Sequence, residues 1–336
     1  MTAPSDARAM AAPGAAGECL ISVVIPTYDR PAYLRLALAS VLAQSHRRLE
    51  VIVSDNASPQ DPAAIIAEFD DPRIRLHRNP RNLGITGNIL AGVALASGKY
   101  LAILGDDDVW RGDFLATLLR PLEGDPGVVV AFCDHDIIDA NGEVNAARTE
   151  EVSRRFGRHL LRDGVYRPFD EIALVYRAIC VVSGSLIRRD AIPWSRIPPD
   201  LPVSVDLYIA HLLAASGGSC AFIARRLMQY RYHSLQSARS FTNVHSSWRA
   251  DLGSTLDLWL AFLRDGRAKS RAYVKMICTR KAVLILVERL RRRQWRELAA
   301  DLARFLRKGL LDPRAIYYHL YYFQRFRRER TGRLIP

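Results

Sequence analysis

Residues 101–110 read LAILGDDDVW, and three adjacent carboxylates, those of Asp106, Asp107 and Asp108, follow the apolar run directly. Four apolar residues in a row are typical of a strand that is buried on both faces. Adjacent aspartates repel one another, so they require either hydration or a cation. The pattern favours an oxygen-ligand site for a hard cation such as Mg²⁺ or Mn²⁺, and a solvated acidic turn is the alternative.

The same arrangement of a buried strand and a polar ending occurs twice upstream. The run 20–25 leads into Pro26, Thr27, Tyr28 and Asp29, and the run 49–53 leads into Ser54, Asp55 and Asn56. Further strands are predicted at 74–79, 99–105 and 128–139, with helices at 33–43, 62–69, 85–96 and 114–122. This alternation predicts an α/β fold with a mainly parallel sheet flanked by helices. Because ligands bind at the carboxyl ends of parallel strands, we expect the three polar endings to line one rim.

The second half of the chain is less regular. Residues 141–178 are mixed and polar, which predicts loops or insertions. We expect a strand at 180–189, a helix at 205–216, a strand and loop at 221–234, and helices beyond residue 245.

Charge divides the chain into two parts. Residues 245–336 hold 22 Lys and Arg against 8 Asp and Glu, whereas residues 1–244 hold 26 against 27. We therefore predict a near-neutral globular body over 19–244 and a helical, basic extension over 245–336 that meets something anionic. Residues 1–18 are rich in Ala, Pro and Gly and are expected to be a disordered lead without the apolar core of a signal peptide.

The five cysteines show no Cys-x-x-Cys spacing, and no apolar stretch reaches the length of a membrane-spanning helix. A reducing, cytoplasmic location fits both observations. In the basic extension, apolar residues recur at helical spacing next to clustered arginines: Trp295, Leu298, Ala299, Leu302, Phe305 and Leu306. Such a helix indicates peripheral docking on an anionic membrane, and packing of the stripe against the catalytic body is the alternative. The neutral body argues against nucleic acid as a partner.

The segments SVVIPTYDRPAYLRLALASVLAQSHRRLEVIVSDNAS and NLGITGNILAGVALASGKYLAILGDDDVW together resemble a family 2 glycosyltransferase. The resemblance covers about residues 20–240 and implies the GT-A fold, a nucleoside diphosphate sugar donor and inversion at the transferred carbon. It also implies Mn²⁺ or Mg²⁺ as cofactor, and a glycan or lipid-linked acceptor in cell-surface polysaccharide synthesis.

The resemblance assigns roles to individual residues. Asp206 is the expected catalytic base, and Asp107, with Asp108 and His233, is expected to hold the metal. Asp55 is expected to bond the base of the nucleotide, which favours a UDP- or dTDP-sugar. The other residues expected to bind the nucleotide or donor are Pro26, Thr27, Tyr28, Arg30, Asn82, Gly84, Asn88, Asp106, Ser183, Gly184 and Arg231.

The chain departs from the family pattern at two positions. Gly105 stands where many members carry the first Asp of the acidic run, so the register of the three aspartates is open by one position. Val205 replaces the Glu that usually precedes the base, and an N-cap is the alternative role for Asp206. Two other functions also stay open at this point: a non-catalytic scaffold that binds sugar or nucleotide on the same fold, and a nucleotidyltransferase.

Overall fold

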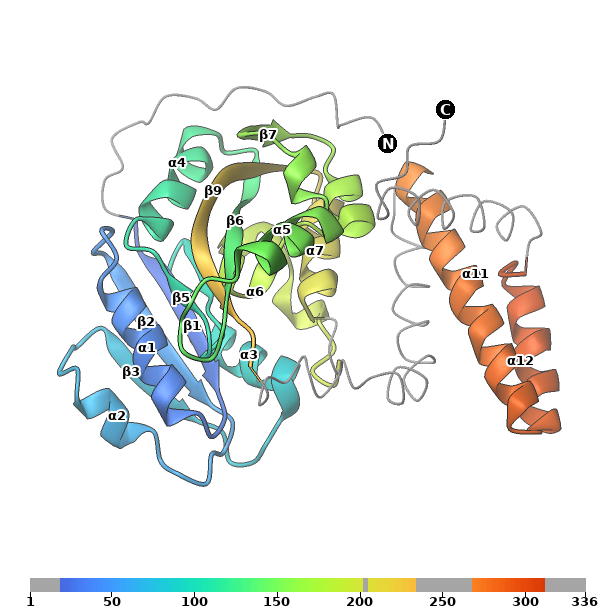
Figure 1. Ribbon diagram of the computed structural model, residues 1–336, viewed down its shortest axis with the longest axis horizontal. Coiled ribbons are helices and arrows are strands. Elements are labelled where there is room, and N and C mark those ends of the chain that lie inside the picture. The colour runs from blue at the N-terminus through green and yellow to red at the C-terminus, as the bar shows by residue number, and fades with distance from the viewer. Residues whose placement is uncertain (1–18, 202–204, 234–267, 312–336) are drawn as a thin grey trace. The chain divides into compact units, whose positions relative to one another are not determined.

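The computed structural model describes residues 19–201, 205–233 and 268–311 (Figure 1). The chain divides into two units, Met1–Gln236 and Ser237–Pro336. The predicted lead over residues 1–18 lies outside the described residues, as do residues 245–267 of the predicted basic extension.

Within the described residues the first unit contains one nine-stranded sheet in the order β3-β2-β1-β4-β8-β6-β9-β5, with β7 also paired to β9. The strands are β1 Ile21–Thr27, β2 Leu49–Asp55, β3 Ile74–Arg78, β4 Tyr100–Ile103, β5 Val109–Trp110, β6 Val128–Ile138, β7 Gly164–Tyr166, β8 Ser185–Arg188 and β9 Ser219–Arg231. The helices of this unit are α1 Pro31–Leu42, α2 Ala63–Ala67, α3 Gly84–Ala94, α4 Phe114–Gly124, α5 Ala146–Arg155, α6 Val181–Gly184 and α7 Val205–Ala215.

The sheet is mainly parallel, as predicted, with antiparallel pairs added by its later strands, and β6 forms a long parallel ladder with β9. Strands β3, β2, β1 and β4 pair in parallel, as the alternation of strands and helices predicted. The next strand, β8, runs antiparallel to both β4 and β6, and β9 pairs antiparallel with β5 and β7. Strands β8 and β9 pair with strands that are distant in the sequence, and local periodicity does not predict such pairing.

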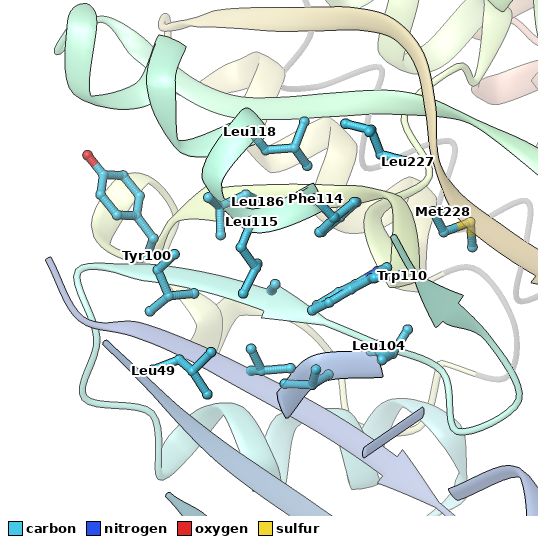
Figure 2. Close-up of a cluster of buried hydrophobic side chains, with 14 of the residues drawn as sticks. Leu49, Tyr100, Leu104, Trp110, Phe114, Leu115, Leu118, Leu186, Leu227 and Met228 are labelled. Atoms are coloured by element: carbon cyan, nitrogen blue, oxygen red, sulfur yellow. The ribbon is translucent and has the colours of Figure 1, made fainter. Parts of the chain in front are cut away.

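The core forms because helices with one apolar face cover the buried strands. In α1 the residues Leu34, Leu38 and Val41 recur at helical spacing and are almost fully buried. They join side chains of α4 in one cluster, in which the ring of Trp110 stacks on that of Phe114 with 4.3 Å between centroids (Figure 2). This packing fixes the start of α4 beside the loop of the three aspartates.

Residues 141–178, predicted to be loops, contain helix α5 and strand β7 as well as a π-helical turn at Glu171–Tyr176. The side chain of Asn145 accepts a hydrogen bond from the Arg148 amide at 2.9 Å and so caps the start of α5. The small buried residues Thr149 and Ser153 then pack under β6. The prediction was wrong here because the helix has only this narrow polar contact face and no apolar stripe.

The second unit is described over α11, Ala268–Arg291, and α12, Trp295–Arg307. The apolar residues predicted to form one stripe on α12 differ in their exposure. Phe305 is fully buried, whereas Trp295, Leu302 and Leu306 are 61%, 41% and 60% exposed. None of the helices in the described residues combines the length and the apolar character needed to cross a bilayer.

Candidate active site

The ends of β1, β2 and β4 meet at one edge of the sheet. Thr27 pairs with Asp55 across β1 and β2, and the Thr27 hydroxyl donates to Asp106 Oδ2 at 2.8 Å. The rim expected from the sequence is therefore present, and the acidic loop after β4 lies directly against the loop after β1.

Asp106 and Asp107 are held by two cationic or potentially cationic side chains. Arg30 Nη1 lies 2.9 Å from Asp106 Oδ1 and 3.1 Å from Asp107 Oδ2. His233 Nε2 lies 3.0 Å from the same Oδ2 of Asp107. Three segments that are far apart in the sequence thus converge on one carboxylate oxygen.

Asp108 faces a different set of partners. Its Oδ1 accepts the backbone amide of Arg231 at 2.9 Å. The Arg231 side chain is buried and donates to the backbone carbonyls of Asp107, Asp139 and Ala140. Arg231 therefore braces the acidic loop against the end of β9, and the phosphate contact suggested for it stays a prediction.

The acidic loop is deeply buried, which shifts its proton equilibria. Burial raises the pKa of Asp106 to about 6, and the negative charge of Asp107 adds to the increase. Burial and the same neighbouring charge raise the pKa of Asp108 well above its usual range. Both carboxyls therefore gain from a nearby cation, because a positive charge stabilises their ionised forms.

A short turn around Ser183 links the acidic loop to the far side of the site. The Ser183 hydroxyl accepts the Gly105 amide at 2.9 Å, and its carbonyl accepts the Trp110 indole N–H at 2.6 Å. Ser183 holds a φ of 74°, which is uncommon for a residue with a side chain. Gly105 is one of the two positions that depart from the family pattern. A Cβ there would lie 3.1 Å from Asp107 Oδ1, so a glycine avoids a close contact with the carboxylates.

Asp206 lies on the other side of the same turn. Helix α7 begins at Val205, so Asp206 is in its first turn, and its Oδ1 accepts the amide of Val182 at 2.7 Å. This contact joins Asp206 to a segment outside α7. Burial raises the pKa of Asp206. A carboxylate in this condition has a greater affinity for a proton than an exposed one, as a general base requires.

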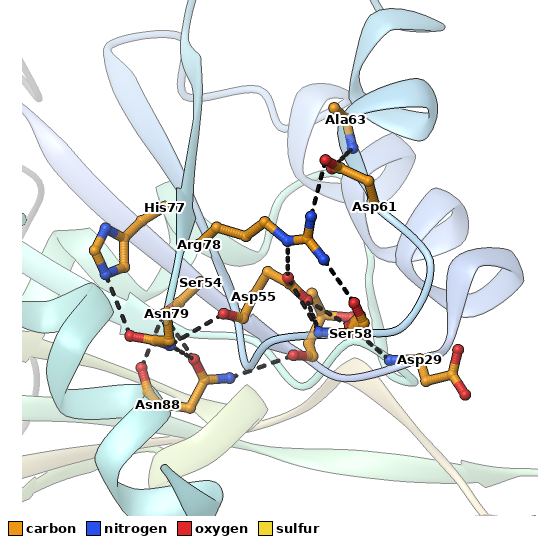
Figure 3. A network of polar contacts seen from close by, with 11 residues as sticks. Asp29, Ser54, Asp55, Ser58, Asp61, Ala63, His77, Arg78, Asn79 and Asn88 are labelled. Carbon is orange, nitrogen blue, oxygen red and sulfur yellow. Dashed lines mark hydrogen bonds and ion pairs between the residues drawn. The ribbon is translucent and has the colours of Figure 1, made fainter. Parts of the chain in front are cut away.

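Asp55 belongs to a closed polar network at the end of β2 (Figure 3). Its carboxylate is fully buried, accepts the Ser58 amide at 3.2 Å and also bonds the Ser58 hydroxyl. Arg78 Nε donates to the other carboxylate oxygen at 2.9 Å. These partners hold Asp55 in place, and a contact with a nucleotide base stays a prediction.

The remaining residues assigned to the nucleotide loop form a bridge between β2 and α3. Asn88 is 3% exposed, and its Oδ1 accepts from Ser54 and Asn79, each at 2.8 Å. Asn82 Oδ1 accepts the amide of Gly84 at 2.9 Å, and Gly84 has a φ of 73°. Asn88 therefore fastens α3 to the sheet, and Asn82 shapes the turn before it.

Beside this network lies a hollow of about 120 Å³ between the end of β1, the start of α1 and the 58–65 segment. It is lined by Thr27, Asp29, Arg30, Pro31, Leu34, Ser58, Gln60, Asp61, Pro62, Ala64 and Ile65. The side chain of Tyr28, at the same loop, is 45% exposed. An aromatic side chain held half in solvent offers a surface on which a planar base can stack.

Sequence reasoning missed three residues of this region. Arg78 bonds Asp55, and Trp110 holds Ser183. Tyr33 of α1 packs its ring 4.7 Å from that of His233. Arg78 follows the same rule as the aspartates, since it stands at the carboxyl end of β3, whereas nothing in the local sequence of Tyr33 indicates its partner.

The side chains of Asp107 and His233 suit a divalent cation that a substrate also coordinates. Among the described residues no group of three His, Cys, Asp or Glu side chains is arranged to enclose a metal. Of the three predicted ligands the structure brings Asp107 and His233 together, while Asp108 is directed to Arg231. Mg²⁺ and Mn²⁺ characteristically take one or two protein ligands, with the remainder from phosphate and water. The pair of Asp107 and His233 meets that requirement.

Two solved structures resemble the chain in fold. S. aureus TarS 1–349 in complex with UDP-GlcNAc has a TM-score of 0.58 at 14% sequence identity, covering 78% of this chain and 71% of that one. The mannosyltransferase PcManGT from Pyrobaculum calidifontis, in complex with GDP-Man and Mn²⁺, has a TM-score of 0.55 at 18% identity and covers 92% and 85%. These likenesses show that the first unit of the chain has the GT-A fold that the sequence predicted.

Comparison of sequences gives the family. Residues 22–183 match the family model described as glycosyl transferase family 2. The succinoglycan biosynthesis protein ExoO of Rhizobium meliloti is 26% identical over 311 residues, which are 88% of this chain and 82% of that protein. A GalNAc(5)-diNAcBac-PP-undecaprenol beta-1,3-glucosyltransferase of Campylobacter jejuni is 35% identical over 103 residues, 30% of this chain and 33% of that protein. Residues 22–183, just under half of the chain, therefore belong to glycosyltransferase family 2.

Proposed function

We propose that this glycosyltransferase moves a sugar from a nucleoside diphosphate donor to a hydroxyl of a glycan or lipid-linked glycan, with inversion and with a divalent cation. The observation that carries the proposal is the turn at Ser183. One side of the turn bonds the acidic loop through Gly105, and the other bonds Asp206 through Val182. The acidic loop, proposed to meet the leaving diphosphate, and Asp206, proposed to meet the attacking hydroxyl, are thus both bonded to adjacent residues of one short segment.

The roles of the chain's own groups follow from their charge. Asp107 and His233 would hold Mn²⁺ or Mg²⁺, which would neutralise the charge that develops on the diphosphate as it leaves. Asp206 would accept the proton of the acceptor hydroxyl as that oxygen attacks the sugar carbon from the face opposite the diphosphate. A single displacement of this kind inverts the configuration at that carbon.

The donor and acceptor classes rest on the relatives. TarS is described with UDP-GlcNAc and PcManGT with GDP-Man, so the fold accommodates more than one base. We propose a uridine or thymidine nucleotide from the position of Asp55. The name of the Campylobacter relative specifies a glycan on diphospho-undecaprenol, and that of ExoO specifies polysaccharide synthesis. A lipid-linked acceptor in cell-surface polysaccharide synthesis agrees with both.

The first test is the thermal stabilisation of the full chain by UDP, dTDP, GDP and CDP, each with and without Mn²⁺. We expect a shift that requires the metal and one of the pyrimidine nucleotides. The Asp206→Asn variant is expected to keep that shift while transfer falls by at least about a hundredfold, since it keeps its shape but cannot take a proton. Near-normal transfer by Asp206→Asn would remove the base assignment, and no shift with any nucleotide would favour the non-catalytic scaffold.

We also propose that the second unit docks on anionic membrane from the cytoplasmic side. At 100° per residue, Trp295, Leu302 and Leu306 lie on one side of α12, and all three are exposed. The exposed Arg296 and Arg307 lie next to this stripe, both on the same side of it. An apolar stripe bordered by cations is the pattern of a helix that lies in a membrane surface.

Sedimentation of the full chain with liposomes tests this docking. The Leu306→Glu variant should lose most of its binding to phosphatidylglycerol vesicles, because it places a charge in the stripe. Ala300→Glu adds the same charge on the opposite side of α12, where Ala300 is exposed, and should bind nearly as well as the unmodified chain. Equal binding by all three proteins would contradict the proposal.

A further inference from the structure

The group nearest to the proposed metal position is a side chain of the protein itself. Arg30 Nη1 lies 2.9 Å from Asp106 Oδ1 and 3.1 Å from Asp107 Oδ2, so one guanidinium nitrogen bridges two carboxylates. The Oδ2 of Asp107 is also the oxygen that His233 contacts at 3.0 Å. The positive charge of Arg30 is therefore located where Asp107 would offer an oxygen to a divalent cation.

Burial explains why a cation is needed in this position. The side chains of Asp106 and Asp107 are 5% and 10% exposed, and that of Arg30 is 16% exposed. Two buried carboxylates without a counter-charge are strongly unfavourable, and a bridging guanidinium compensates them. A divalent cation would satisfy the same carboxylates, and its charge would repel a guanidinium that is held at the same oxygen.

The attachment of Arg30 allows the side chain to leave. Arg30 precedes Pro31 at the start of α1, with φ −134° and ψ 58°, and does not belong to the acidic loop. Its long side chain can therefore rotate without disturbing Asp106 or Asp107. The hollow beside the end of β1 is lined by Arg30 itself, which gives the side chain neighbouring space.

We propose that Arg30 is an internal counter-ion which occupies the metal position in the ligand-free enzyme and is exchanged for Mn²⁺ or Mg²⁺ when the donor binds. The inference rests on the proposed function, since it requires a metal at Asp107. Displacing Arg30 is unfavourable when it has no other anion to contact. The diphosphate supplies that anion, so metal and nucleotide each promote the binding of the other.

The exchange makes a prediction about metal binding alone. The unmodified chain should bind Mn²⁺ weakly without nucleotide and much more tightly with UDP. In Arg30→Gln the competing charge is absent, so Mn²⁺ alone should bind about tenfold more tightly or better, and the gain from UDP should shrink. Arg30→Lys keeps the charge but not the geometry of a guanidinium, and should bind Mn²⁺ with intermediate affinity.

The measurement is the concentration of free Mn²⁺ by electron paramagnetic resonance, with full-length protein and with or without UDP. Arg35→Gln is the matched control, because Arg35 lies in the first turns of α1, five residues after Arg30, and pairs with the exposed Glu68. Tighter binding in Arg30→Gln with no change in Arg35→Gln supports the exchange. Equal or weaker binding in Arg30→Gln overturns it while the proposed metal site stands. Absence of Mn²⁺ binding in every protein, even with UDP, removes the metal site and the exchange together.

Discussion

Asp106 provides a sharp test of the electrostatics of the acidic loop, because its replacement by Asn should stabilise the ligand-free protein. Burial raises the pKa of Asp106 from 3.8 to about 6, so the folded state holds a proton more tightly than the unfolded state. Stability due to this group is therefore greatest at low pH and falls as the pH rises through about 6. A difference between 3.8 and about 6 corresponds to a cost of about 3 kcal/mol at neutral pH.

Asp106→Asn removes that cost and keeps an acceptor for the Thr27 hydroxyl, which donates at 2.8 Å in the native protein. Thermal unfolding of the full chain without metal should show a gain of up to about 3 kcal/mol at pH 7.5, or about 6–12 °C for a domain of this size. At pH 4.5 the gain should fall to about 1 kcal/mol, because the native carboxyl is then mostly protonated in the folded state.

Asp190→Asn is the control, since Asp190 is exposed and lies far from the acidic loop in the sequence. Its stability should change by less than about 0.5 kcal/mol at both pH values. A loss of stability in Asp106→Asn at pH 7.5 would refute the reasoning, because it would mean that the ion pair with Arg30 outweighs the cost of burial. An equal gain at both pH values would also refute it, because the gain would then not come from ionisation.

Two further substitutions test how the site is supported. Gly98→Ala should destabilise the protein by about 1–3 kcal/mol in urea unfolding, since a Cβ there would lie 2.7 Å from the Ser22 backbone nitrogen. Gly112→Ala is the control and should leave the stability nearly unchanged, because a Cβ there would lie 3.6 Å from its nearest neighbour. Trp110→Phe should cost about 1–3 kcal/mol and weaken UDP binding in calorimetry, because it leaves the Ser183 carbonyl without its 2.6 Å indole donor. Unchanged UDP affinity in this variant would show that Ser183 is held by other contacts.

The first half of the fold could be predicted because its signals are local. The run from Ile21 to Ile25 is buried at every position and apolar except for Ser22. Polar residues at or just after the ends of β1, β2 and β4 mark the rim. The acidic loop and Asp206 were also detectable, because the resemblance to the family fixes their positions in the order of motifs.

The rest depended on contacts between distant residues. No sequence period indicates that β8 inserts between β4 and β6, or that Arg30 turns toward Asp107, 77 residues away. Asp55 and Asn88 have the residue types of a ligand site, yet their side chains are bonded within the protein. The residue types and their positions after the strands indicated where Asp55 and Asn88 lie, whereas only the structure shows which atoms their side chains contact.

Strand β9 is the last strand of the catalytic unit in the sequence, yet it lies between β6 on one side and β5 and β7 on the other. During synthesis, about 80 residues are therefore added after β6 before its partner β9 is made, and until then one edge of β6 is unpaired. In the complete sheet β6 is buried along its whole length. An open apolar edge of this kind is prone to pair with other chains. Because β9 also ends at Arg231, just before His233, the step that closes this edge completes the acidic loop, and the nascent chain should acquire affinity for nucleotide and protection from aggregation at the same moment.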